Sequence, residues 1–265
     1  MSNVPPSPAT IKSLVQAQFA PSAAAYVTSS THAHGADLAR LIELAQLSGH
    51  ESVLDVATGG GHTALACAPQ ARHVVASDLT LAMLHEARKY IQTHAIPNVT
   101  YCRSEAEHLA FADASFERVT CRIAAHHFAD VRAFAREAAR VLKPGGLLLV
   151  SDHIGLEDPE YDQFMDRFER WRDPSHVRAY TFSEWRTFCQ AAGLEIIHTE
   201  DDPRESYDFA SWAARLRMPD HERDQLAAWL LAAPSHLREY FAVVEAEGTV
   251  KSLRSTFGIF VAIKR

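Results

Sequence analysis

The chain of 265 residues lacks the features that mark membrane proteins, secreted disulfide-rich proteins and nonspecific nucleic-acid binders. No apolar run approaches the roughly 18 residues of a membrane-spanning helix, and the opening MSNVPPSPATIKS has no apolar centre typical of a signal peptide. The formal net charge is −7, from 26 basic and 33 acidic residues. This charge disfavours nonspecific nucleic-acid binding, which needs a basic surface, although it is compatible with a specific RNA substrate. We therefore expect a cytoplasmic protein with neither a membrane nor a nucleic-acid partner.

Motifs for redox chemistry and for metal binding are also missing. The 4 cysteines form no C-x-x-C pair, so we expect free thiols in a reducing compartment. There is no H-E-x-x-H, and the pair His32 and His34 has no third ligand at a recognisable spacing. We therefore expect no metal site.

The middle of the chain alternates short apolar runs with helical patterns. Strands are expected at residues 52–57, 73–78, 99–103, 118–124 and 147–152, and helices at 62–69, 80–94 and 129–142. Strands that alternate with helices predict a doubly wound α/β fold, in which helices cover both faces of a parallel sheet.

The segments on either side of this core have a different pattern. Residues 1–9 are rich in proline and serine and are expected to be disordered, whereas 10–28 and 35–47 are predicted to be helices. After residue 152 we expect helices at 157–172, 183–193, 207–217, 222–232 and 235–246, and strands at 194–200 and 256–264. These segments are helical additions to one domain.

A glycine-rich stretch, DVATGGGHTA at residues 55–64, follows the first expected strand. Gly59, Gly61 and Ala64 match the G-x-G-x-x-G/A loop of dinucleotide sites. A carboxylate at Asp55 would repel a pyrophosphate, however, and would attract a cationic amino group. The Tyr-x-x-x-Lys motif of short-chain dehydrogenases is missing as well. The loop therefore favours a ligand with an amino-acid part over a dinucleotide.

Acidic residues follow the next two expected strands as well. Asp78 ends the second strand, where its carboxylate can accept hydrogen bonds from both hydroxyls of a ribose. Glu105 follows the third strand, where an acid can accept a hydrogen bond from an adenine amino group. Ligands of open α/β sheets bind outside the carboxyl ends of the strands. Three acids at successive strand ends therefore suit an amine, a ribose and an adenine.

These motifs together resemble a known family. The segments VLDVATGGGHTA, CRIAAHHF, VLKPGGLLLVSD, DPSHVR and FGIFVAIKR are similar to those of class I S-adenosylmethionine-dependent methyltransferases, most closely the small bacterial methyltransferases related to the ubiquinone and menaquinone C-methyltransferases. The resemblance implies a Rossmann-like sheet of seven strands, mostly parallel, with the last strand antiparallel. It also implies that residues 1–50 form part of a lid, that 51–152 bind S-adenosylmethionine, and that 153–265 complete the sheet and contribute a substrate cap.

The resemblance further assigns cofactor contacts. The residues expected to bind S-adenosylmethionine are Asp55, Ala57, Thr58, Gly59, Gly61, Asp78, Leu79, Met83, Glu105, Ala106, Arg122 and Ile123. The glycine loop would hold the amino-acid part and Asp78 the ribose. Leu79 and Met83 would flank the adenine, while Arg122 and Ile123 would line the methionine end.

Two of these positions depart from the family pattern. Ala57 stands at the usual first glycine, which is a mild change if its backbone φ is below zero. Glu105 stands where an aspartate is commoner, and Ala106 beside it is expected to offer its backbone N–H to the adenine ring.

Histidines and aromatic residues are the candidates for catalysis and for the lid. A base helps a methyl acceptor to lose its proton, and His126, His127 and His153 each follow a strand at the ligand edge. The alternative for each histidine is a packing or cofactor contact. The lid and substrate chamber are expected to include Phe19, Tyr26, His32, Phe164, Phe168 and Trp171, for which core packing is the alternative.

The expected function is therefore transfer of a methyl group from S-adenosylmethionine to a small, partly apolar metabolite, with S-adenosylhomocysteine as product. Oxygen or carbon is the favoured acceptor. The alternative is a protein of the same fold that binds the cofactor without methyl transfer, as a cyclase or a small-molecule-binding protein. We expect a monomer or a homodimer.

Overall fold

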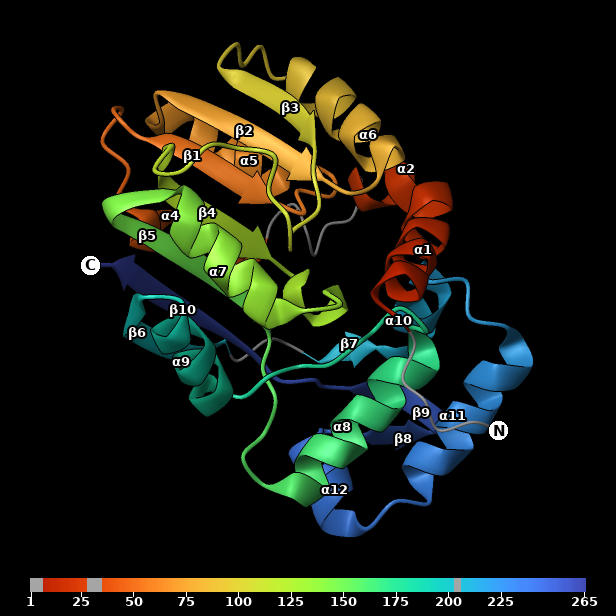
Figure 1. Cartoon of the computed structure of the whole chain (residues 1–265). Helices are drawn as coiled ribbons and strands as arrows, with labels where there is room; N and C mark the ends of the chain where they lie inside the picture. The colour runs from red at the N-terminus through yellow and green to blue at the C-terminus, as the bar shows by residue number, and fades with distance from the viewer. Residues whose placement is uncertain (1–6, 28–34, 203–205) are drawn as a thin grey trace.

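The computed structural model describes residues 7–27, 35–202 and 206–265. Its centre is a seven-stranded sheet with the strand order β3-β2-β1-β4-β5-β10-β6 (Figure 1). The strands are β1 (Ser52–Val56), β2 (His73–Asp78), β3 (Val99–Arg103), β4 (Phe116–Arg122), β5 (Leu142–His153), β6 (Leu194–Asp202) and β10 (Phe257–Lys264). Paired strands are parallel except for β10, which is antiparallel to both β5 and β6. The predicted doubly wound, mostly parallel sheet with an antiparallel last strand is confirmed.

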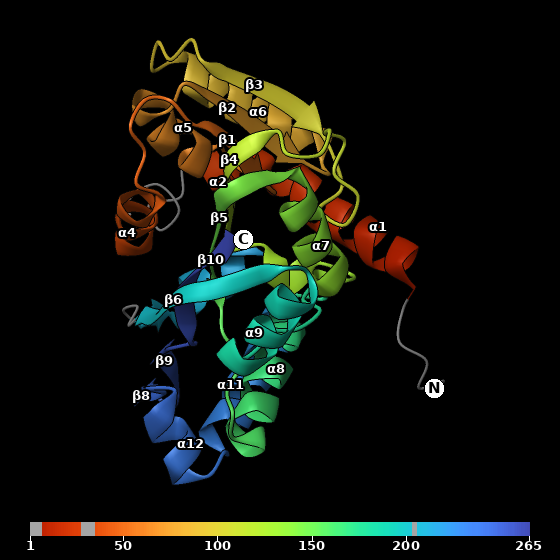
Figure 2. The same ribbon diagram turned by 60° about the vertical axis from the view of Figure 1, so that its left-hand side comes forward.

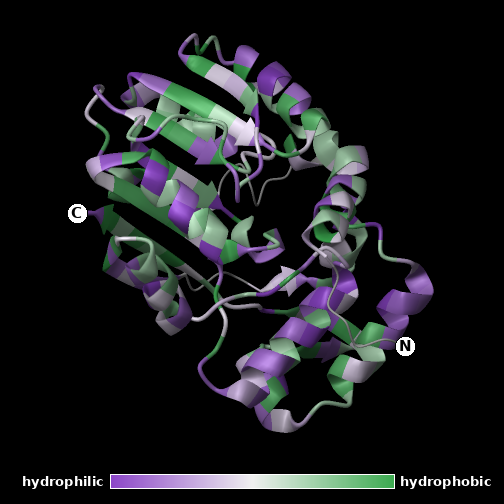
Figure 3. Ribbon diagram, in the orientation of Figure 1, coloured by the Kyte–Doolittle hydropathy of each residue, from purple (hydrophilic) through white to green (hydrophobic). Residues whose placement is uncertain are grey.

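Helices cover both faces of this sheet because its strands are apolar on both sides. Leu147 and Leu149 of β5 pack with α4, whereas Leu148 and Val150 pack with α7 and α9. These helices and two more against the sheet are α4 (Ala36–Ala45), α5 (His62–Cys67), α6 (Leu81–Gln92), α7 (Val131–Val141) and α9 (Phe182–Ala191). Figure 2 shows α4 and α5 on one side of the sheet and α7 and α9 on the other. The green of the inner strands in Figure 3 reflects this two-sided burial.

The N-terminal helices lie beside the sheet rather than within its layers. Ser7 caps α1 (Pro8–Phe19), and the first residue of this helix is a proline, whose fixed φ suits that position. The expected disorder over residues 1–9 is therefore wrong from residue 7 onward, and 1–6 lie outside the described residues. The single helix expected over 10–28 is divided by a 3₁₀ turn, Ala20–Ser22, before α2 (Ala23–Val27). Pro21 within that turn has no N–H to continue the α-helical hydrogen bonds.

Helix α1 connects two parts of the molecule. The side-chain amide of Gln16 donates to the carbonyl oxygen of Leu79, just after β2, at 3.3 Å. The amide of Gln18 donates to the carbonyl oxygen of Leu216, in the C-terminal half, also at 3.3 Å. One helix therefore contacts both the sheet and the segments added to it.

The additions after β5 form a second hydrophobic cluster. They comprise α8 (Pro159–Arg172), α10 (Phe209–Arg215), α11 (Asp220–Leu231) and α12 (Ser235–Tyr240), with a small antiparallel sheet of β7 (Tyr207–Asp208), β9 (Thr249–Leu253) and β8 (Val244–Ala246). We call this part the cap; it occupies the lower part of Figure 1. In the described part of the chain, no helix has the length and apolar character that crossing a bilayer requires.

The helix expected over 235–246 is wrong in its second half. Helix α12 ends at Tyr240, Ala242 has a φ of 46°, and residues 244–246 form β8. The next two residues, Glu247 and Gly248, have φ values of 54° and 77°, which is the backbone of a two-residue hairpin turn. The helical apolar spacing concealed this hairpin, and only Gly248 marked the turn.

A buried ion pair attaches α4 to the end of β4. Arg122 donates from Nε and Nη2 to the two carboxylate oxygens of Asp37, at 2.5 and 2.9 Å. Both side chains are nearly inaccessible to solvent, with 4% and 3% of their surface exposed. Two parallel hydrogen bonds fix the orientation of the guanidinium as well as its charge. The end of β4 is thereby held at one angle to α4.

Two residues at neighbouring strand ends have a left-handed backbone. Ala57, directly after β1, has a φ of 54°, and Ile123, directly after β4, has a φ of 53°. Alanine in place of the usual glycine was expected to be a mild change if φ at Ala57 were below zero. The φ is positive, and only glycine adopts this conformation without cost, so the change is not mild. The β-branched Ile123 is more strained still. Such strain is concentrated at functional sites.

Replacing Ala57 by glycine should stabilise the protein. A non-glycine residue in the left-handed region costs about 1–2 kcal/mol, and the added freedom of glycine in the unfolded chain offsets about 0.5–1 kcal/mol of that gain. We expect the free energy of unfolding in urea to rise by up to about 1 kcal/mol. Ala20→Gly, at a right-handed position with a φ of −57°, should instead lower it by about 1 kcal/mol. If Ala57→Gly instead lowered the free energy of unfolding, the conclusion that the backbone at Ala57 is strained would be wrong.

Asp37→Asn should destabilise the protein strongly, because it removes the charge against which Arg122 is buried. Breaking one partner of a buried pair costs about 3–5 kcal/mol. Urea denaturation measures this loss. Asp220→Asn is the control, since Asp220 pairs with Arg223 at the surface with 84% of its side chain exposed, and it should change little. Equal effects of the two substitutions would disprove a special role for the buried pair.

Candidate functional site

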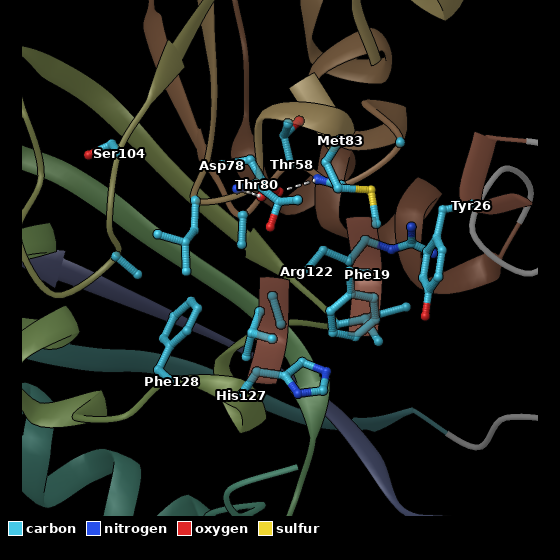
Figure 4. Close-up of a pocket in the computed structure, with 18 of the residues that line it drawn as sticks. Phe19, Tyr26, Thr58, Asp78, Thr80, Met83, Ser104, Arg122, His127 and Phe128 are labelled. Carbon is cyan, nitrogen blue, oxygen red and sulfur yellow. Dashed lines mark hydrogen bonds between the residues drawn. The ribbon is translucent and has the colours of Figure 1, made fainter. Parts of the chain in front are cut away.

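A pocket opens at the carboxyl ends of β1, β2 and β4, where the strand order reverses. It encloses about 1000 Å³, its open mouth included. Most of the residues expected to bind a cofactor line it: Ala57, Thr58, Gly59, Asp78, Leu79, Met83, Ala106, Arg122 and Ile123. Figure 4 shows side chains from the separate strand ends, among them Asp78, Arg122 and His127, around one space.

The glycine loop is held against the end of β2. The N–H of Thr58 donates to the carbonyl oxygen of Ser77 at 2.9 Å, and the N–H of Gly59 donates to Asp78 Oδ2 at 3.0 Å. Gly59 has a φ of 54°, and no atom lies within 4 Å of the place where a Cβ would stand. The loop thus leaves open space along its backbone, as a ligand that approaches closely requires.

Gly61 has a packing role rather than a place in the pocket lining. It precedes α5 with a φ of 84°, and a Cβ there would come within 3.0 Å of Ala87 Cβ and Ile91 Cδ1 on α6. The glycine therefore allows α5 and α6 to approach each other. Its expected contact with a ligand is not supported by this position.

Asp55 lies behind the glycine loop, outside the pocket lining. Its two carboxylate oxygens accept hydrogen bonds from the hydroxyls of Thr58, at 2.6 Å, and Thr120, at 2.8 Å. Burial raises the pKa of Asp55 to about 6, against the opposing effect of these hydrogen bonds. The expected direct contact with a ligand amine is therefore not supported. Asp55 instead fixes the loop through Thr58.

Asp78 does face the pocket. Its Oδ1 accepts from the N–H of Thr80 at 2.8 Å, and its Oδ2 accepts from the N–H of Gly59. Each oxygen keeps further acceptor capacity for a ligand hydroxyl. Burial raises the pKa of this carboxyl to about 6, although the backbone hydrogen bonds favour the ionised form.

Glu105 is turned away from the pocket. Its carboxylate accepts a hydrogen bond from Lys12 of α1 at 2.6 Å, and 46% of the side chain is exposed. Lys12 also lies 3.4 Å from Glu107, and both of these residues line the pocket. Glu105 is not among the lining residues, and its pairing with Lys12 gives no support to the expected contact with an adenine. The apolar residues Leu79, Met83, Ala106 and Phe128 line this end of the pocket.

A second cavity of about 540 Å³, its mouth included, adjoins the first. Four residues line both cavities: Phe19, Tyr26, Ile123 and His127. The rings of Phe19 and Tyr26 lie 5.5 Å apart edge to face, and Phe19 lies 5.0 Å from the His127 ring. We call these four residues the junction. Phe19 and Tyr26 therefore take the positions expected of lid residues.

His127 is the candidate base that lies at the junction. Its Nδ1 lies 3.0 Å from the carbonyl oxygen of Ser175, and since a carbonyl only accepts, Nδ1 carries the proton. Nε2 therefore carries the lone pair, 3.8 Å from Asp173. Burial and the neighbouring charge of His126 lower the pKa of His127 to about 4. The ring is neutral at pH 7 and can accept a proton.

The other two candidate bases line only the second cavity. His126 Nδ1 lies 2.6 Å from Asp152 Oδ1, and although burial lowers its pKa, the Asp152 carboxylate outweighs this and raises it. His153 Nδ1 lies 3.2 Å from the Ser255 hydroxyl. With His176, these histidines form a buried cluster in which the ring of His126 is 4.0 Å from His127 and 4.7 Å from His153.

Three other expected lid residues, Phe164, Phe168 and Trp171, line neither cavity. Phe164 and Phe168 are buried in the cap cluster and Trp171 packs against it, so the alternative of core packing is correct for them. His32 lies outside the described residues.

The sequence alone did not reveal several lining residues. Lys12 enters the first cavity from α1, and Arg172, Arg215 and Phe257 enter the second from the cap and β10. These residues are far from the strand-end motifs in the sequence. Only the tertiary fold brings them to the site.

Comparison with known proteins agrees with this geometry. A family model described as a methyltransferase domain matches residues 54–150. YcgJ of Bacillus subtilis, named an uncharacterized methyltransferase, is 38% identical over 227 residues, which are 85% of this chain and 88% of YcgJ. The ubiquinone/menaquinone biosynthesis C-methyltransferase UbiE of Bartonella tribocorum is 34% identical over 121 residues, 44% of this chain and 46% of UbiE.

A solved structure extends the likeness to three dimensions. The BH2331 protein of Bacillus halodurans C-125 is 39% identical and superposes with a TM-score of 0.84, covering 87% of this chain and 99% of that one. The extent of the match to YcgJ, together with the sheet order and the strand-end pocket, shows that the chain belongs to the class I S-adenosylmethionine-dependent methyltransferases.

Proposed function

We propose that this protein transfers a methyl group from S-adenosylmethionine to a small, partly apolar metabolite, with oxygen or carbon as the acceptor atom. The observation that carries the proposal is the pair of cavities that meet at the junction. A glycine-lined cavity beside an aromatic, histidine-lined cavity suits the passage of a group from one bound molecule to another. A monomer or homodimer acting in the cytoplasm remains part of the proposal.

The residues of the first cavity fit S-adenosylmethionine. Asp78 offers carboxylate oxygens with spare acceptor capacity for the ribose hydroxyls. Arg122, held by Asp37, presents a cation that suits the carboxylate of the methionine end. The open space beside Gly59 leaves room for a ligand backbone, and Leu79 and Met83 provide apolar surface for the adenine.

The chemistry then depends on position, exclusion of water and one proton. S-adenosylmethionine, when bound, supplies a methyl group on a positively charged sulfur. The protein needs to align the acceptor and to take up its proton. Phe19 and Tyr26 close the junction from the N-terminal helices, which restricts water there.

His127 is the best placed of the three candidate bases. It lies at the junction, and its proton on Nδ1 leaves Nε2 as the acceptor. The Asp152 carboxylate, 2.6 Å from His126 Nδ1, raises the pKa of His126 and orients its ring. His153 shapes the far wall of the second cavity.

Asp78→Ala should weaken the binding of S-adenosylhomocysteine, the product. Loss of a charged hydrogen-bond partner costs about 1–3 kcal/mol, which corresponds to a rise in Kd of roughly 5- to 150-fold. Isothermal titration calorimetry measures this. Asp113→Ala is the control, since Asp113 lies outside the pocket with 80% of its side chain exposed, and it should leave Kd unchanged. If the unsubstituted protein does not bind the product at millimolar concentration, the proposed function fails.

The affinity for S-adenosylhomocysteine should also depend on pH. The raised pKa of Asp78, about 6, means that its carboxylate becomes protonated as the pH falls through 6 and then accepts ribose hydroxyls less well. One pH unit below the pKa, only about a tenth of the Asp78 carboxyl groups are ionised. We therefore expect Kd to rise by about tenfold from pH 7.5 to pH 5. Calorimetry at both pH values tests this. The variant Asp78→Asn should show a much flatter profile, and an equal slope in both proteins would show that another group is responsible.

A further inference from the structure

The second cavity contains a cation that no described residue neutralises. Arg215 ends α10, is half-buried and lines the cavity. Its guanidinium has no hydrogen-bond or ion-pair partner among the described residues. Burial and the nearby charge of Arg172 lower its pKa, and the remaining titratable neighbours are the phenols of Tyr26 and Tyr207. Within the described part of the chain, no carboxylate pairs with this charge, although Asp173 lines the same cavity.

Arg172 adds to the positive charge beside Arg215. Its Nε donates to the carbonyl oxygen of Trp212 at 3.1 Å, and its guanidinium lies 4.6 Å from the centre of the Trp212 ring. Glu169 lies 3.7 Å from it, beyond hydrogen-bond distance, and Asp173 is also near enough for its charge to interact with that of Arg172. Arg172 is thus held in place mostly by neutral groups.

The acidic residues around the cavity are engaged elsewhere. Asp152 is bound to His126 at 2.6 Å. Asp173 accepts from the Ser175 hydroxyl at 2.5 Å and lies 3.8 Å from His127. Neither carboxylate interacts with Arg215. A part-buried cation without a counter-ion costs free energy, and a bound anion would recover that cost.

The rest of the cavity wall is aromatic or apolar. Tyr207, Trp212, Leu216 and Phe257 line it beside the two arginines. Both guanidinium groups are close enough to the Tyr26 phenol to act on its pKa, so they lie near the junction. A ligand complementary to these lining residues has an apolar or aromatic body, which packs against the rings, and one acidic group, which pairs with an arginine.

We propose that the second cavity binds a small carboxylic acid with an aromatic or apolar body, and that Arg215, assisted by Arg172, holds its carboxylate. A planar guanidinium pairs with a carboxylate through two parallel hydrogen bonds. The role of this acid as methyl acceptor rests on the proposed function. The binding of the acid in the second cavity does not depend on that function. Arg215 is then a determinant of specificity, because a neutral analogue leaves the cation unpaired.

The test compares acids with uncharged analogues of the same shape. Calorimetry measures the binding of benzoate, 4-hydroxybenzoate and cinnamate, and of their amides, with and without saturating S-adenosylhomocysteine. We expect at least one acid to bind at least tenfold more tightly than its amide. Arg215→Gln should reduce this preference to less than threefold, and Arg215→Lys should retain part of it. Arg217→Gln is the matched control, because Arg217 is exposed and does not line the cavity.

Three outcomes would overturn the proposal. They are equal affinity for acid and amide, a preference for the acid that persists in Arg215→Gln, and no binding of any acid at 10 mM. A cooperative thermal transition in Arg215→Gln shows that the variant is folded. If S-adenosylhomocysteine binds and the acids do not, only this proposal fails. If the acids bind and S-adenosylhomocysteine does not, only the proposed function fails.

Discussion

The reversal of strand order between β1 and β4 determines where a ligand can bind in this molecule. The chain leaves β1 toward α5 on one face and leaves β4 toward α7 on the other, so no connection covers the gap between the two strand ends. Both exits require a left-handed residue, Ala57 and Ile123. The first cavity lies between the ends of β1 and β4 because the segments that follow these two strands run to opposite faces of the sheet.

Charge is distributed unequally between the two cavities. Around the first, the buried charges have protein partners: Asp55 has two threonines, Asp78 has two backbone N–H groups, and Arg122 has Asp37. These groups hold one arrangement before any ligand arrives, which is the condition for binding without reorganisation. In the second cavity, the Arg215 charge has no such partner. The first cavity is therefore preorganised for its ligand, whereas the second is completed by its ligand.

The sequence predicted the sheet and most of the first cavity because their signals are local. A strand followed by glycines, and an acid at the end of the next strand, are read within a few residues, and Thr58, Gly59 and Asp78 line the pocket as expected. The hydrogen bonds of Asp55 to Thr120 and of Glu105 to Lys12 could not be predicted, because these partners are distant in the sequence. Arg215 carried no signal at all. Its importance depends on the finding that no carboxylate of residues 7–27, 35–202 and 206–265 pairs with it, which only the fold reveals.

Helix α1 has a consequence for the timing of the reaction. It is bound to the end of β2 through Gln16 and to the cap through Gln18, and Phe19 at its end lines both cavities. A displacement of α1 that admits a molecule to one cavity therefore also disturbs the wall of the other. If the proposed cofactor and acceptor occupy the two cavities, their exchange is therefore coupled through the position of a single helix.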